Sequence, residues 1–71
     1  MNWVKVLYPE SRTVYIGDTP LGSTNTKQFV GEDATHVFHL GEPVDYKPKS
    51  IRRRVAGTSR RDPLVIRFEQ A

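Results

Sequence analysis

The stretch that decides the fold is residues 13–22, which read Thr13-Val14-Tyr15-Ile16-Gly17-Asp18-Thr19-Pro20-Leu21-Gly22. Val14 and Ile16 are β-branched and two residues apart, so in a strand their side chains leave the same face. Gly17 and Asp18, followed by Pro20 and Gly22, supply the backbone freedom and the fixed φ that a chain reversal needs. The stretch therefore predicts a β-hairpin.

The same two-residue alternation recurs on both sides of the hairpin. In the run from Trp3 to Tyr8, Val4, Val6 and Tyr8 share one face and Trp3, Lys5 and Leu7 share the other, before Pro9 ends the run. Further strands are predicted at Lys27 to Val30, Ala34 to Leu40, Ser50 to Val55 and Leu64 to Glu69. We expect Phe38 with Leu40, and Leu64 and Ile66 with Phe68, to point inward.

No segment has apolar residues three and four apart over three turns, so no substantial helix is expected. Six or seven short strands separated by turns predict an all-β fold, a small antiparallel β-sandwich or partly open barrel. The turn after Pro9 is short, so the first two strands should be close neighbours. Residues 41–49 form the longest predicted loop, which is ordered only if Val44 or Tyr46 packs inward.

A chain of 71 residues predicts one domain, residues 1–71, near the size at which one core just offsets chain entropy. Self-association through edge strands is left open as a further source of stability. The chain has no cysteine, which excludes disulfides and thiolate sites. Its N-terminal segment is too short in apolar content for a signal peptide or membrane span, so we expect a soluble chain without membrane insertion.

Charge is unevenly distributed. Residues 1–45 carry three cations against six acids, whereas residues 46–71 carry eight cations against two acids. The cations between Tyr46 and Arg61 are Lys47, Lys49, Arg52, Arg53, Arg54, Arg60 and Arg61. Alternation places Arg52 and Arg54 on one face, and the following turn would bring Arg60 and Arg61 near them, which predicts a basic patch for phosphates or carboxylates. The alternative is a solvated edge strand whose charges block association.

Residues 4–40 resemble a PEGA domain, a small bacterial and archaeal β-domain. The matching elements are Tyr8-Pro9, Thr13-Val14-Tyr15-Ile16, Gly17-Asp18, Leu21-Gly22-Ser23-Thr24 and Thr35-His36-Val37-Phe38. The resemblance implies a transthyretin-like β-sandwich that serves as a non-enzymatic module in cell-envelope or multidomain proteins. It brings no catalytic residues to this chain.

Catalytic and metal sites are not indicated. His36 and His39 are three apart, so in a strand they point to opposite faces and do not chelate one ion together. Asp18, Glu32 and Asp33 lie in predicted turns, where acidic side chains bond the local backbone. The serines have no signature context. We expect no enzyme activity, no metal and no cofactor.

Trp3 and Tyr15 fall on outward or edge positions and form a second candidate surface, for protein contact. The sequence favours a non-catalytic interaction module whose partner is a protein or an anionic cell-envelope polymer. The alternative is a small basic β-protein that binds nucleic acid through the tract at 46–61. No aromatic residue is interleaved with the cations of that tract, and Tyr46 is the only aromatic residue within it, which weighs against the alternative.

Overall fold

The computed structural model describes residues 1–71 and contains strands but no helix, so it has no helix that is able to cross a membrane. The predicted all-β class is confirmed. The strands are β1 (Asn2–Leu7), β2 (Thr13–Ile16), β3 (Thr19–Ser23), β4 (Lys27–Gly31), β5 (Ala34–His39), β6 (Tyr46–Lys47), β7 (Ile51–Val55), β8 (Leu64–Arg67) and β9 (Glu69–Gln70). Each predicted strand is present, β6 is an additional two-residue strand, and the predicted strand Leu64 to Glu69 is divided at Phe68 between β8 and β9.

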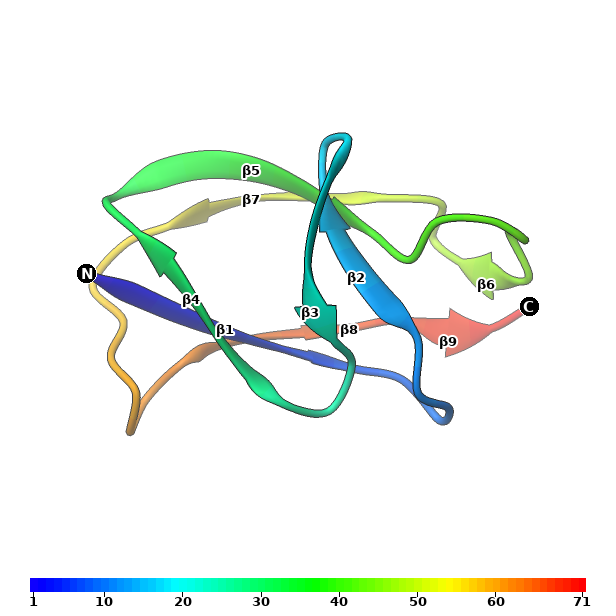
Figure 1. The fold of residues 1–71 in the computed structure, drawn as a ribbon, viewed down its shortest axis with the longest axis horizontal. Helices are drawn as coiled ribbons and strands as arrows, with labels where there is room; N and C mark the ends of the chain where they lie inside the picture. The colour runs from blue at the N-terminus through cyan, green and yellow to red at the C-terminus, as the bar shows by residue number, and fades with distance from the viewer.

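Three sheets make up the molecule, and none closes into a barrel. A three-stranded sheet has the order β4-β1-β8, a four-stranded sheet has the order β3-β2-β5-β7, and β6 pairs with β9. In Figure 1, β5 and β7 run along the top, β1 and β8 run along the bottom, and β6 and β9 lie together near the C-terminus.

The two larger sheets pack across one core. The core contains side chains from both sheets, from β6 and from residues that adjoin the strand ends: Val4, Val6, Tyr8, Val14, Phe38, Leu40, Tyr46, Val55, Ile66 and Phe68. Val4, Val6 and Ile66 come from the three-stranded sheet, and Val14, Phe38 and Val55 from the four-stranded one. The inward alternation predicted for β1, β5 and β8 is therefore confirmed. Burial of these side chains is the main stabilising contribution in so small a domain.

The predicted hairpin is β2 and β3. Ile16 pairs with Thr19 across the turn, where Gly17 adopts a φ of 58° that glycine reaches without steric strain. Val14 is fully buried, and Ile16 packs against the core from the same face.

Two pairings differ from the expectation. β1 and β8 are parallel, with Val4 opposite Leu64 and Val6 opposite Ile66, so the three-stranded sheet is mixed rather than antiparallel. The reason is topological, because the loop after Val55 carries the chain from one sheet to the other before β8 begins. The short connection after β1 likewise changes sheets, so the first two strands are consecutive but not paired.

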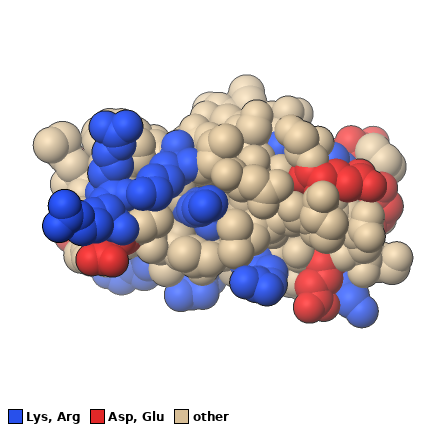
Figure 2. Space-filling model, turned by 90° about the horizontal axis from the view of Figure 1, so that it is seen from below, with Lys and Arg blue, Asp and Glu red and all other residues tan.

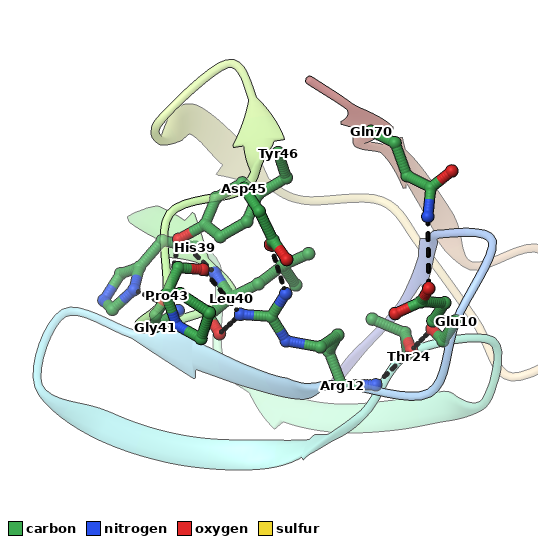
Figure 3. Close-up of polar contacts among 10 residues, drawn as sticks. All are labelled: Glu10, Arg12, Thr24, His39, Leu40, Gly41, Pro43, Asp45, Tyr46 and Gln70. Carbon is green, nitrogen blue, oxygen red and sulfur yellow. Dashed lines mark hydrogen bonds and ion pairs between the residues drawn. The ribbon is translucent and has the colours of Figure 1, made fainter.

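Arg12 anchors the long loop at residues 41–49 (Figure 3). Its guanidinium pairs with Asp45 at 2.6 Å and donates to the carbonyl oxygens of Pro43 at 2.9 Å and Leu40 at 3.3 Å. It also lies over the ring of Tyr46, 5.4 Å from the centroid. The hydrogen bond that Arg12 donates to the Asp45 carboxylate raises the pKa of Arg12.

Tyr46 packs inward from the same loop, whereas Val44 stays exposed. The Tyr46 hydroxyl donates to the carbonyl oxygen of Gly41 and accepts from the backbone N–H of Leu40. The loop was predicted to be ordered only if Val44 or Tyr46 packs inward, and Tyr46 does so.

Candidate functional site

The outer face of the three-stranded sheet combines aromatic and basic side chains. Cross-strand pairing sets Trp3 opposite Phe29, sets Lys5 between Lys27 and Val65, and sets Leu7 opposite Arg67. Because Val4 and Val6 point into the core, these partners all point outward. We call this set the β1 face: Trp3, Lys5, Leu7, Lys27, Phe29, Val65 and Arg67.

Trp3 and Phe29 form an aromatic pair on this face, in which Trp3 is half-buried and Phe29 is exposed. Their ring centroids are 5.6 Å apart at an interplanar angle of 68°, an edge-to-face arrangement. Phe29 keeps 49% of its surface exposed, and so does Val65 two strands away. Apolar side chains left outside a core this small mark a candidate contact surface.

Arg60 lies over Trp3, with its guanidinium carbon 5.6 Å from the ring centroid. Thr58 holds this loop in place, since its hydroxyl accepts the backbone N–H of Trp3 at 2.9 Å and donates to the Asn2 side chain at 2.8 Å. Asn2 is buried and donates in turn to Asp33 at 2.7 Å. A small polar network thus fixes the edge of the β1 face.

The cations of this face have no acidic partner. The structure contains a single ion pair, between Arg12 and Asp45, so Lys5, Lys27 and Arg67 are not neutralised by a carboxylate. Lys5 and Lys27 also stand directly opposite one another, an arrangement that destabilises a sheet. A local cost of this kind is typical of a surface kept for binding.

Figure 2 views the molecule from the β1 and β8 side. Lysine and arginine side chains cover much of the left part of this view and continue across its middle, while most of the acidic side chains lie toward the right end and some acidic atoms lie at the lower left. The positive charge is therefore spread along one side of the molecule and not confined to one loop.

A shallow hollow continues the face at the end of β1. Its volume is about 410 Å³, and it is lined by Leu7, Tyr8, Pro9, Asn25, Arg67, Phe68, Glu69 and Gln70. Leu7 and Arg67 belong to the β1 face as well, so the hollow and the sheet surface are continuous. The burial of Tyr8 raises the pKa of its hydroxyl, and the nearby Asp45 carboxylate adds to the effect.

The basic tract predicted from the sequence divides over the molecule. Arg52 and Arg54 project from the four-stranded sheet, opposite Val37 and Thr35. Arg60 lies at Trp3 on the other sheet rather than beside them.

The other cations of the tract lie apart from this pair. Lys47 sits in β6 next to Glu69, Lys49 follows it, and both are exposed. Arg61 is exposed in the loop before β8, and Arg53 is exposed opposite His36.

Trp3 and Tyr15 also lie on different sheets, so they do not form one surface. Tyr15 stacks on His39, with ring centroids 5.1 Å apart and an interplanar angle of 6°. His39 accepts the backbone N–H of Gly41 through Nδ1 and donates from Nε2 to the carbonyl oxygen of Gly17. His36 is turned toward the opposite side, at the edge of Phe38.

No group of three or more His, Asp or Glu side chains is placed to hold a metal ion. Asp33 bonds Asn2, while Asp18 and Glu32 are exposed in turns.

Sequence reasoning missed Lys5, Lys27, Phe29, Val65 and Arg67 as members of a site. Each stands at an outward position of an alternating strand, which was the available signal. What was lacking was the pairing of β4 and β8 with β1, because neither follows β1 directly in the chain.

No family model, no curated protein and no solved structure matches this chain. The PEGA resemblance therefore rests on the sequence pattern alone, and the function has to be argued from the β1 face.

Proposed function

We propose that this domain is a non-catalytic module that binds single-stranded nucleic acid on the β1 face. The observation that carries the proposal is the pair of half-buried Trp3 and exposed Phe29 among the unpaired cations Lys5, Lys27 and Arg67, with Arg60 at its edge. Proteins that bind single strands combine aromatic side chains, on which bases stack, with cations that follow the phosphates.

The sheet supplies the spacing that such binding needs. Lys5 and Lys27 come two residues along from the aromatic pair on their own strands, and Arg67 lies beyond them. Adjacent strands are about 4.8 Å apart, so the face presents rings and cations within the reach of neighbouring nucleotides. The sheet also fixes the backbone of these residues, so the ordering cost on binding is confined to their side chains.

A protein partner or an anionic cell-envelope polymer is the competing proposal. An anionic polymer without rings satisfies the cations but leaves Trp3 and Phe29 without a role. A duplex hides its base faces from the aromatic pair. The proposal therefore expects a preference for single strands over both duplexes and polyphosphate.

The test is a fluorescence-anisotropy titration of labelled oligo(dT) and oligo(U) at several salt concentrations. Four cations, Lys5, Lys27, Arg60 and Arg67, predict a slope of log affinity against log salt of about −2.8, at roughly −0.7 per contact. Unlabelled duplex of the same length and polyphosphate of matched charge serve as competitors.

Weaker competition by both competitors than by an unlabelled single strand supports the proposal. Equal competition by polyphosphate would point to an anionic polymer as the ligand. No binding to either oligonucleotide at micromolar protein and low salt would remove nucleic acid as the partner.

A further inference from the structure

The outer face of the four-stranded sheet has the same kind of composition as the β1 face. Pairing sets Arg52 opposite Val37, Arg54 opposite Thr35, and Tyr15 opposite His39. We call this set the β5 face: Tyr15, Thr35, Val37, His39, Arg52 and Arg54. It contains no carboxylate, neither arginine has an acidic partner, and Val37 keeps 39% of its surface exposed.

The β5 face also has a flat aromatic element. Tyr15 and His39 are stacked nearly parallel, and His39 is held by hydrogen bonds to Gly17 and Gly41. Gly41 lies close under Tyr15, since a Cβ at that position would come within 2.6 Å of the ring. The stack is therefore fixed by its surroundings, and both rings are half-buried, so a base can pack only against the part of the stack that stays exposed.

The two faces point in opposite directions. Side chains alternate along every strand, so the outward residues of each sheet point away from the core that both sheets share. Packed sheets lie about 10 Å apart, so the two faces lie on opposite sides of the molecule.

We propose that the domain is bivalent: the β5 face binds a second single strand, so that one chain bridges two nucleic-acid segments. This inference rests on the proposed function of the β1 face. The chemistry is the same on both sides, since two unpaired arginines take phosphates and the Tyr15–His39 stack takes a base.

The first measurement is stoichiometry. Calorimetric titration with an oligo(dT) of roughly six nucleotides, a length within the range of small single-strand sites, should reach two oligonucleotides per chain. For the variant Arg52→Gln/Arg54→Gln the stoichiometry should fall to one oligonucleotide per chain. That oligonucleotide should still quench the emission of Trp3 on the β1 face. The matched variant Lys5→Gln/Lys27→Gln should weaken binding on the β1 face, where Trp3 is quenched, and should leave binding on the β5 face unchanged.

The second measurement is bridging. Donor- and acceptor-labelled oligonucleotides should show energy transfer when wild-type protein is added, and the transfer should fall again at excess protein. Light scattering should find one chain in the bridged complex. The Arg52→Gln/Arg54→Gln variant should abolish the transfer.

A stoichiometry of one with quenched Trp3 would overturn bivalency and leave the proposed function standing. Energy transfer that survives in the double-arginine variant, or a bridged complex with two chains, would also overturn it. Absence of any binding would remove both proposals.

Discussion

Replacing Trp3 by leucine removes the larger ring of the aromatic pair while keeping an apolar side chain on β1. The proposed stacking of a base on Trp3 contributes about 1–3 kcal/mol. At 1.4 kcal/mol for each factor of ten, Trp3→Leu should raise the Kd for oligo(dT) by about 5- to 150-fold. The backbone N–H that bonds Thr58 is retained, so the loop that carries Arg60 keeps its attachment.

The assay is anisotropy of a labelled oligonucleotide, because the variant has no tryptophan left to report. Trp3→Leu and its control are compared in the Arg52→Gln/Arg54→Gln background, so that binding on the β5 face does not contribute. Trp3→Phe is the matched control and should lose much less affinity, since it keeps a ring. Urea unfolding should show that Trp3→Leu is folded, although the lost edge-to-face pair and the lost Arg60 contact reduce its stability by about 1–2 kcal/mol. A folded Trp3→Leu protein with wild-type affinity would refute base stacking on Trp3.

Three further outcomes are expected. Lys5→Gln/Lys27→Gln should reduce the salt slope by about 1.4 without lowering stability, because it relieves a like-charge pair; an unchanged slope would contradict phosphate contacts there. Arg12→Ala should lower the unfolding free energy by about 2–3 kcal/mol in urea, because it removes three hydrogen bonds of a charged group; a loss near zero would contradict the anchoring role. The raised pKa of Tyr8 means that the folded state holds this proton more tightly than the unfolded state, so stability is full below the ordinary value of 10.0 and falls as pH rises above it. Tyr8→Phe should show a shallower alkaline decline of the urea midpoint, and an equally steep decline would contradict this assignment.

Most of what the sequence could predict came from the alternation of apolar and polar side chains along single strands. Val4 and Val6 point inward and Trp3 points outward because a strand has a two-residue period and only apolar side chains gain from burial. The same rule placed Phe38 and Leu40 in the core. These are local consequences of the pattern, and no other segment needs to be known.

The β1 face required information that no single segment holds. Trp3 and Phe29 meet because β4 returns antiparallel to β1, and Arg67 joins them because β8 runs parallel to β1 from the far end of the chain. The contiguous run Arg52-Arg53-Arg54 is easy to notice in the sequence. In the structure all three are exposed on one sheet, but Arg53 projects from the opposite face to Arg52 and Arg54. The residues of the β1 face lie singly on β1, β4 and β8, so they cannot be recognised as one surface until the pairing of these strands is known.

The most direct test of the central claim is the emission of Trp3, the only tryptophan in the chain, during titration with unlabelled oligo(dT) at low salt. Stacking of a base on the ring should quench this emission with a saturating curve that follows binding, and polyphosphate of matched charge should leave it nearly unchanged. Binding of the oligonucleotide with no change in Trp3 emission would contradict the assignment of the β1 face.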